Sequence, residues 1–316
     1  MLLVRREFLS GMAAMSAASA FSRFPALNDS SPFRISVIND EISEDFGRSC
    51  EVAANEFGMH WIELRSMWKK NIVNLDQKEV AEAQRILKKY QLQVTDIASP
   101  LFKVDWPGAP KSKFSEHNDF RADFSFAEQD EVLERAIAMA KGFQTDRVRC
   151  FDFWRLADQA PYRAAINEKL MQAAGQAGEK GIILVLENDS SNNTATGAEA
   201  AKVLAEVKSP NLMLNWDPGN AAASGEIPYP NGYELLPKGR IGHCHCKDAV
   251  KKGKDYDWAP MGSGIIDWVG QFKALKRDGY HYAVSLETHW RSGSAENSSR
   301  KSWAGMKRLL QQADAL

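Results

Sequence analysis

Short apolar runs rich in β-branched residues alternate along the chain with longer stretches of helical periodicity. The apolar runs, which predict strands, fall near residues 33–38, 59–64, 92–98, 146–151, 181–187, 211–216, 240–246 and 281–287. Between them, apolar residues recur at three- and four-residue steps, as in 76–90, and a last helix is expected over 298–315. This alternation predicts parallel strands joined by helical crossovers.

The eight predicted strands favour a closed α/β barrel. We expect a single-domain (β/α)8 TIM barrel over residues 33–316. An open doubly wound sheet is the alternative, but no GxGxxG motif follows the first strand, and polar residues follow many strands. The connection from Ser99 to about Phe126 is too long for a simple turn, so we predict a lid over the barrel mouth.

The first residues differ in pattern from the rest of the chain. Arg5-Arg6 precedes Phe8-Leu9, an alanine-rich apolar run and the triplet Ala18-Ser19-Ala20. The run is too short to remain as a membrane-spanning helix, so residues 1–20 predict a twin-arginine export signal, with a linker over 21–32. Because of this predicted export signal, we expect a periplasmic protein. An ordinary amphipathic helix over these residues is the alternative.

Composition excludes several classes of protein. The chain of 316 residues is 44% hydrophobic and 26% charged, as in ordinary globular proteins, and we expect no membrane span. A formal net charge of -1 without a basic face argues against nucleic acid as a partner. Four cysteines without CxxC spacing predict buried thiols rather than a disulfide framework. The sequence leaves the oligomeric state open, with a homodimer as one option.

Acidic and imidazole side chains stand at the ends of four predicted strands. Because the carboxyl ends of barrel strands meet at one face, we expect these side chains to converge there. Converging carboxylates repel one another unless a cation neutralises them or they take up protons, so one divalent metal is predicted. The alternative, in which each acid caps a helix or pairs with Lys or Arg, suits any one acid better than the whole set. The predicted metal ligands are Glu187, Asp217, His245 and Glu287.

The predicted ligands also indicate a reaction. Three carboxylates and one imidazole favour Mn²⁺, then Mg²⁺ and Co²⁺, with Zn²⁺ less favoured. Such a cation acidifies a carbon-bound proton beside the carbonyl of a hydroxy-carbonyl compound. Glu187 and Glu287 come from different strands, so one could remove this proton while the other supplies one. This is the chemistry of sugar isomerases and epimerases, with a small-molecule sugar as the partner.

The strand ends resemble the xylose isomerase-like TIM-barrel superfamily, the sugar phosphate isomerase/epimerase group that includes inosose dehydratases, ketose 3-epimerases and endonuclease IV-type enzymes. The likeness runs from about residue 33 to the C-terminus. Its motifs are Asp40-Glu41-Ile42-Ser43, Glu63-Leu64-Arg65, Ser99-Pro100-Leu101-Phe102-Lys103, Leu186-Glu187-Asn188, Trp216-Asp217-Pro218-Gly219-Asn220, His245-Cys246-Lys247-Asp248, Gly262-Ser263-Gly264 with Asp267-Trp268, and Leu286-Glu287-Thr288-His289. The resemblance implies the same four metal ligands and a role for both glutamates in proton transfer.

Two positions depart from the family pattern. Ketose 3-epimerases carry a glutamate six residues after the fifth-strand ligand and a histidine three residues after the sixth-strand aspartate, where this chain has Asn193 and Asn220. Simple ketose epimerisation is therefore in doubt, and endonuclease IV-type cleavage lacks a ligand. One alternative is a lyase or dehydratase acting on a keto-sugar, inositol derivative or keto-glycoside. A second is a non-catalytic carbohydrate-binding barrel.

Further polar and aromatic residues near the strand ends are candidates for binding the substrate. They are Glu63, Lys103, Trp106, Arg149, Asn220, His243, Lys247 and His289. The cations among them could hold sugar oxygens, while Trp106, Trp154 or Trp258 could stack on a sugar ring or simply pack in the core. No glycine-rich phosphate loop follows strands seven and eight, so an unphosphorylated sugar is expected.

Overall fold

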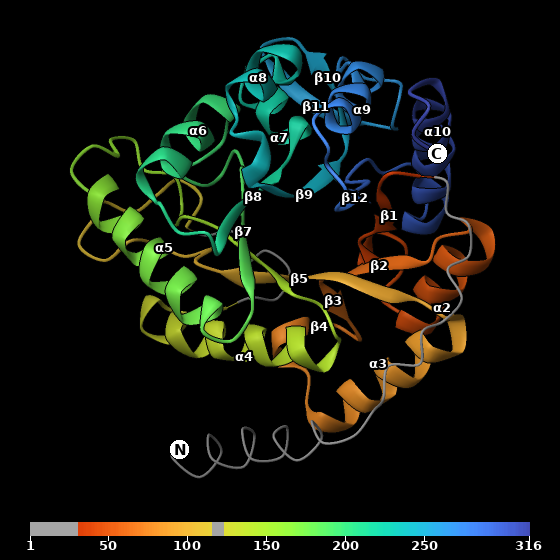
Figure 1. Ribbon diagram of the computed structural model, residues 1–316, viewed down its shortest axis with the longest axis horizontal. Helices are drawn as coiled ribbons and strands as arrows, with labels where there is room; N and C mark the ends of the chain where they lie inside the picture. Colours follow the sequence, from red (N-terminus) through yellow and green to blue (C-terminus); the bar gives the residue numbers. More distant parts are fainter. Residues whose placement is uncertain (1–30, 116–122) are drawn as a thin grey trace.

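The computed structural model describes residues 31–115 and 123–316, so the predicted export signal and residues 21–30 of the linker lie outside the described part. Eight parallel strands form a ring with helices outside it, in the order β1-β12-β9-β8-β7-β6-β5-β2 (Figure 1). They are β1 Arg34–Val37, β2 Trp61–Leu64, β5 Gln93–Leu101, β6 Arg147–Cys150, β7 Ile183–Glu187, β8 Leu212–Trp216, β9 Ile241–Cys246 and β12 Ala283–Leu286. All eight predicted strands are confirmed.

The two ends of the sheet meet, so the single-domain barrel is confirmed. Ile38, directly after β1, forms a parallel bridge with Glu63 of β2. The predicted third strand is longer than expected, because β5 continues to Leu101. The start of the predicted lid is therefore part of the barrel wall, and residues 116–122 of the lid lie outside the described part.

Helices surround the strands and complete the barrel. They are α2 Phe46–Glu51, α3 Gln77–Tyr90, α4 Gln129–Gly142, α5 Arg163–Gly178, α6 Gly197–Glu206, α7 Pro218–Ala223, α8 Tyr233–Leu235, α9 Trp268–Arg277 and α10 Ala295–Gln312. The predicted helix over 76–90 is α3, which Asp76 caps by accepting hydrogen bonds from the main-chain N–H groups of Lys78 and Glu79. Its buried stripe faces the core, as the periodicity predicts.

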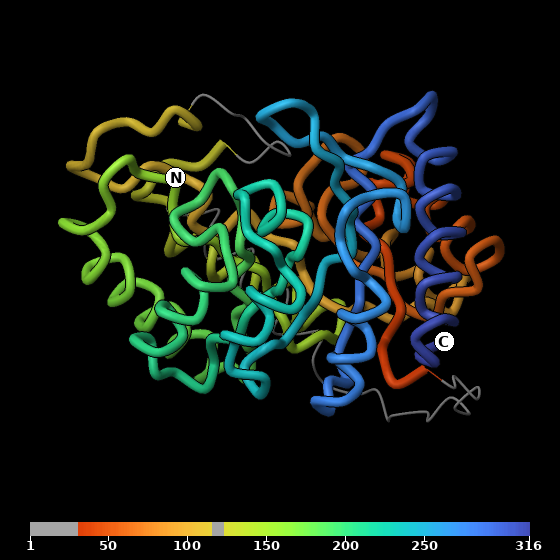
Figure 2. Tube along the Cα trace, turned by 90° about the horizontal axis from the view of Figure 1, so that it is seen from above, coloured from red at the N-terminus to blue at the C-terminus, as the bar shows by residue number. Residues whose placement is uncertain are grey.

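The last helix packs beside the first described elements (Figures 1 and 2). It begins three residues earlier than predicted, because Ser294 accepts a hydrogen bond from the main chain of Asn297 and caps α10. The Ser299 hydroxyl donates to the main-chain oxygen of Glu41 at 2.7 Å and ties α10 to the segment after β1.

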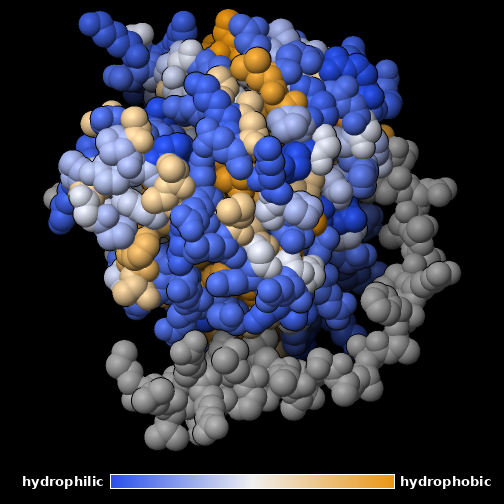
Figure 3. Space-filling view, turned by 60° about the vertical axis from the view of Figure 1, so that its left-hand side comes forward, coloured by the Kyte–Doolittle hydropathy of each residue, from blue (hydrophilic) through white to orange (hydrophobic). Residues whose placement is uncertain are grey.

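Among the described residues, none of the helices is long and apolar enough to cross a membrane. Hydrophilic residues dominate the face in Figure 3.

Strand alternation separates the side chains of β9 into two sets. His243 and His245 lie in the barrel interior, whereas Cys244 and Cys246 join the hydrophobic core between strands and helices. All four cysteines are buried and free, as predicted.

Two antiparallel hairpins follow barrel strands, and the sequence pattern did not predict them. The shorter pairs β3 Ser66–Met67 with β4 Lys70–Asn71. The longer pairs β10 Asp248–Lys252 with β11 Asp255–Ala259. Its turn contains Gly253 at a φ of 66°, a conformation that glycine adopts without strain. The longer hairpin extends the wall of the barrel mouth.

Gly305 in α10 allows this helix to approach the main chain after β11. A methyl group at this position would overlap the main-chain oxygen of Met261. We expect Gly305→Ala to lower the free energy of unfolding by about 1–3 kcal/mol, because the backbone must shift to make room. Denaturant unfolding measures this change.

Gly175→Ala in α5 is the matched control, since no atom other than the neighbouring residues and backbone of α5 itself lies within 4 Å of the added methyl group. This variant should be stabilised by up to about 1 kcal/mol through helix propensity alone. Equal effects of the two substitutions would contradict the close packing of α10.

Candidate functional site

The four predicted ligands meet at the carboxyl end of the barrel. Glu187, Asp217, His245 and Glu287 are buried, and one potential ligand atom from each lies within 4.8 Å of the others. They come from β7, the residue after β8, β9 and the residue after β12. Parallel strands in register bring these positions to one level of the barrel.

The His245 ring is oriented by a buried carboxylate. Its Nε2 lies 3.0 Å from Glu63 Oε1. Its Nδ1 faces three carboxylate oxygens, at 3.3 Å from Glu187 Oε1, 3.4 Å from Glu287 Oε2 and 3.8 Å from Asp217 Oδ2. If Nε2 carries the proton given to Glu63, Nδ1 presents a lone pair, to which Asn215 Nδ2 can donate at 3.3 Å. A cation among the three carboxylate oxygens, or a second proton on the ring, would remove the repulsion that is left.

The charges of the cluster set the protonation of its members. Burial lowers the pKa of His245, but Glu63, Glu187 and Glu287 together raise it well above the ordinary value. Burial raises the pKa of Glu187, but His245 and Arg149 lower it overall. Burial likewise raises the pKa of Glu287, yet the charges of His289, Lys247 and His245 hold it well below the ordinary value. Both glutamates are therefore carboxylates at neutral pH.

Cationic side chains already contact the acidic cluster. Lys247 Nζ lies 2.6 Å from Glu287 Oε2 and 2.9 Å from Asp217 Oδ2. Arg65 Nη1 lies 3.0 Å from Glu287 Oε1. Neutralisation of the three carboxylates therefore does not by itself require a metal ion, although their mutual repulsion was the reason for predicting one from the sequence.

Two other features fit a divalent cation. Arg149 Nη1 lies 3.1 Å from Glu187 Oε2, but among the described residues this oxygen has no hydrogen-bond partner. Asp217 caps α7 with Oδ1, which accepts from Asn220 N at 2.9 Å, while Oδ2 stays directed at the cluster. Helix capping thus uses one oxygen of Asp217 and leaves the other to the site.

A cavity of about 290 Å³ lies over this cluster. Five predicted substrate contacts line it, namely Lys103, Arg149, Asn220, Lys247 and His289. Glu187 and Glu287 also line it, whereas Asp217 and His245 are absent from its wall. Both predicted acid–base residues can therefore reach a molecule in the cavity.

The structure places three predicted substrate contacts outside the cavity wall. Glu63 and His243 are fully buried beneath the cluster, where His243 Nε2 lies 3.0 Å from Glu63 Oε2. Trp106 packs edge-on against Phe153, with ring centroids 4.8 Å apart. Strand alternation explains the first two, because both side chains point into the barrel interior. Among the three tryptophans considered for stacking, Trp258 lines the cavity.

The two asparagines that depart from the family pattern have different surroundings. Asn220 Nδ2 donates to Glu187 Oε1 at 3.2 Å and to Asp217 Oδ2 at 3.0 Å, so it holds two of the predicted ligands. Asn193 instead fixes a loop, since its Nδ2 donates to the main-chain oxygen of Asp152 and its Oδ1 accepts from Leu156 N. Asn193 does not line the cavity.

The Gly262-Ser263-Gly264 segment is bound by a carboxylate of the protein itself. Asp248 Oδ2 accepts hydrogen bonds from Gly262 N at 2.9 Å and Gly264 N at 3.0 Å. These N–H groups would otherwise be the donors for a phosphate. In this segment, Asp248 therefore occupies both of these donors.

Sequence reasoning missed a buried charge network behind the site. Arg65 bridges Glu41, Asp40 and Glu287. Asp96 lies beneath the site, with Oδ1 3.6 Å from His243 Nδ1. The motifs contained Arg65, Asp40, Glu41 and Glu287, but they stand in three separate motifs, and the sequence does not show that they pair.

A sequence model described as xylose isomerase-like TIM barrel matches residues 52–310. The chain belongs to this family. No curated protein sequence matches it significantly.

Solved structures support the xylose isomerase-like fold at low sequence identity. The probable 3-DHS dehydratase AsbF from Bacillus anthracis is 19% identical with a TM-score of 0.67, over 87% of this chain and 98% of that chain. D-allulose 3-epimerase from Methylomonas sp., in complex with D-allulose, is 18% identical with a TM-score of 0.62, over 89% and 98%. The IOLI protein with a bound zinc atom is 14% identical with a TM-score of 0.65, over 90% and 99%.

The burial of Asp96 predicts a pH-dependent stability. Burial and the nearby Glu63 carboxylate raise the pKa of Asp96 to about 6. Because the folded state binds this proton more tightly than the unfolded state, stability is lost as pH rises from about 4 to 6. Asp96→Asn removes this loss, so its free energy of unfolding relative to wild type should rise by up to about 3 kcal/mol between pH 4 and pH 8.

Urea unfolding of both proteins at the two pH values measures this difference. The exposed Asp130→Asn variant controls for the removal of one carboxylate. A constant difference between Asp96→Asn and wild type across this range would contradict the assignment.

Proposed function

We propose that this protein is a metal-dependent isomerase or epimerase that moves a proton next to the carbonyl of an unphosphorylated sugar or keto-sugar. The observation that carries the proposal is the convergence of three carboxylates and His245 Nδ1 beneath a cavity lined by charged and aromatic side chains. Family membership supports an enzyme of sugar chemistry, since the structural neighbours include a sugar epimerase and a probable dehydratase.

Glu187, Asp217, His245 and Glu287 would hold one divalent ion. The ion, when bound, would supply an electrophile for adjacent substrate oxygens and lower the pKa of the carbon-bound proton beside them. Oxygen donors with one imidazole favour Mn²⁺, with Mg²⁺, Co²⁺ and Zn²⁺ as alternatives. The bound zinc of the IOLI protein supports a metal in this fold without deciding its identity here.

The two glutamates would carry the proton. Both line the cavity, and the structure provides cations that keep them ionised before substrate arrives. Glu187 on β7 and Glu287 after β12 approach from separated strands, so one can take a proton from one side of a carbon while the other returns it.

Lys103, Arg149 and His289 would orient the sugar oxygens. Lys103 Nζ lies 3.3 Å from Asp189 Oδ2, so this pair offers both a donor and an acceptor at the cavity wall. Trp258 adds an aromatic face beside these groups. An unphosphorylated substrate accords with the closed Gly262-Ser263-Gly264 segment and with the export to the periplasm that we propose from residues 1–20.

A lyase reaction at the same site is the second candidate. Asn193 fixes a loop and cannot act as the second glutamate of ketose 3-epimerases, which weakens simple epimerisation. Elimination of water or an aglycone from a keto-sugar, inositol derivative or keto-glycoside would begin with the same proton abstraction. Product analysis separates the two reactions, because a lyase releases a second product.

Proton exchange tests the proposed chemistry directly. In deuterated water, the metal-loaded protein should introduce deuterium next to the carbonyl of a keto-sugar substrate, as followed by NMR. Glu187→Gln and Glu287→Gln should each slow this exchange by about 10²–10⁴-fold, because an amide cannot accept the proton.

The exposed Glu168→Gln variant on α5 is the matched control and should exchange at the wild-type rate. Sugar binding that survives chelation, without exchange or product from any keto-sugar, would instead indicate a carbohydrate-binding barrel.

Removal of one ligand should reduce metal content. Elemental analysis of protein purified without added metal should find about one divalent ion per wild-type chain and much less in Asp217→Asn, because the amide lacks the negative charge that Oδ2 directs at the cluster. The exposed Glu168→Gln variant, which lies outside the cluster, controls for handling losses. Equal metal content in all three proteins would contradict the ligand assignment.

A further inference from the structure

A second cavity adjoins the one above the ligand cluster. It has a volume of about 520 Å³ and shares Ser190 and Trp258 with the smaller cavity. Its walls come from the β10–β11 hairpin, the end of α7 around Ser224 and the loop after β7. The two cavities therefore lie side by side, and the predicted ligands Glu187 and Glu287 are in the wall of the smaller one.

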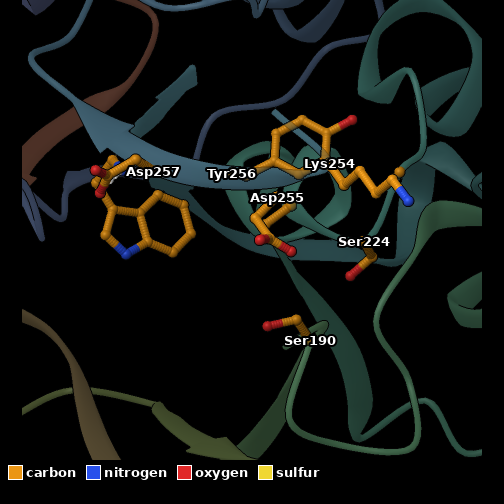
Figure 4. Close-up of a pocket in the computed structure, with 9 residues that line it drawn as sticks. Ser190, Ser224, Lys254, Asp255, Tyr256 and Asp257 are labelled. Carbon is orange, nitrogen blue, oxygen red and sulfur yellow. Dashed lines mark hydrogen bonds between the residues drawn. The ribbon is translucent and has the colours of Figure 1, made fainter. Parts of the chain in front are cut away.

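The second cavity is lined mainly by polar side chains (Figure 4). The Asp255 carboxylate extends from the hairpin toward Ser190 on the opposite side, and the Ser224 hydroxyl faces the same space. Within the part of the chain that the structure describes, the Asp255 side chain has no hydrogen-bond or ion-pair partner. A carboxylate and hydroxyls that face each other across a hollow are suited to a ligand with many hydroxyl groups.

We propose that this cavity is a second subsite, which binds a sugar ring attached to the reacting sugar. The substrate is then a disaccharide or similar glycoside rather than a single sugar. This inference rests on the proposed function for the position of the reacting ring. It specifies a substrate class and adds Asp255, Ser190 and Ser224 as binding residues.

The Asp255 carboxylate favours a sugar ring over other attached groups, and Lys254, which also lines the cavity, is a further donor for ring hydroxyls. A carboxylate can accept two hydrogen bonds from neighbouring hydroxyls, which a phosphate or carboxylate group of a ligand cannot offer. An aromatic group would leave the exposed Asp255 without compensation for lost water, whereas Asp257 is already paired with Lys252. A hydroxylated ring satisfies Asp255.

Trp258 links the two subsites. Lys247 Nζ lies 4.8 Å from the centroid of its ring, and the His289 ring packs edge-on at 5.5 Å. The indole is thus held by two residues that contact the ligand Glu287, while it also lines the larger cavity. Contacts of the second ring can therefore help to place the reacting ring, which is how binding energy away from the chemistry increases rate.

Binding measurements with matched sugars test this inference. Calorimetric titration of the metal-loaded full chain would use D-fructose and four ketose disaccharides, lactulose, maltulose, turanose and isomaltulose. We expect one or more disaccharides to bind about tenfold more tightly than D-fructose. Asp255→Ala should lower this ratio of affinities by about tenfold, as expected for the loss of a charged hydrogen bond.

Lys251→Ala, on the same hairpin but outside the cavity, is the control and should keep the wild-type ratio. Disaccharides that bind no more tightly than D-fructose, or a preference that survives both Asp255→Ala and Ser190→Ala, overturn the second subsite. Preferred binding of disaccharides without deuterium exchange would overturn the proposed reaction and leave the subsite standing.

Discussion

The candidate site depends on the orientation of one buried imidazole. Glu63 holds His245 through Nε2, and this contact turns Nδ1 toward Glu187, Asp217 and Glu287. The supporting carboxylate is itself held by His243, so the arrangement is fixed from inside the barrel. In this buried environment, electrostatic attraction is stronger than in water, and the ring has little freedom to turn away.

Lys247 and a metal ion would compete for the same oxygens. Its ammonium group lies against Asp217 Oδ2 and Glu287 Oε2, the two atoms that also face His245 Nδ1. Binding of a divalent ion would require this flexible side chain to move. The nearby Trp258 ring and cavity offer it a new position, where it could bind an oxygen of the substrate. Lys247 would then neutralise the carboxylates in the empty site and bind the substrate in the filled site.

Much of the fold could be predicted because barrel strands are short, apolar and evenly separated by helices. The ligand residues could also be predicted, since a carboxylate at the end of an apolar strand is buried at a cost in free energy unless it is paired or binds a cation. Glu63 and His243 were predicted as substrate contacts because they stand near the ends of correctly predicted strands. The sequence does not show how deep inside the barrel each side chain lies, and both are fully buried. Depth depends on which strands face each other across the barrel, and β2 and β9 are not neighbours in the sheet.

Long-range packing also explains the other differences. Trp106 lies in an irregular segment, and its aromatic neighbours Phe126 and Phe153 come from separate parts of the chain. The β10–β11 hairpin had a local signal in Gly253, but its role in forming a second cavity depends on α7 and Ser190.

Anomalous diffraction from crystals of the Mn²⁺-loaded protein would test the central claim most directly. The account predicts one strong peak within bonding distance of Glu187, Asp217, His245 and Glu287, with Lys247 displaced from Asp217. A map with no peak among these four side chains, and with the ammonium group still bound to both carboxylates, would contradict it.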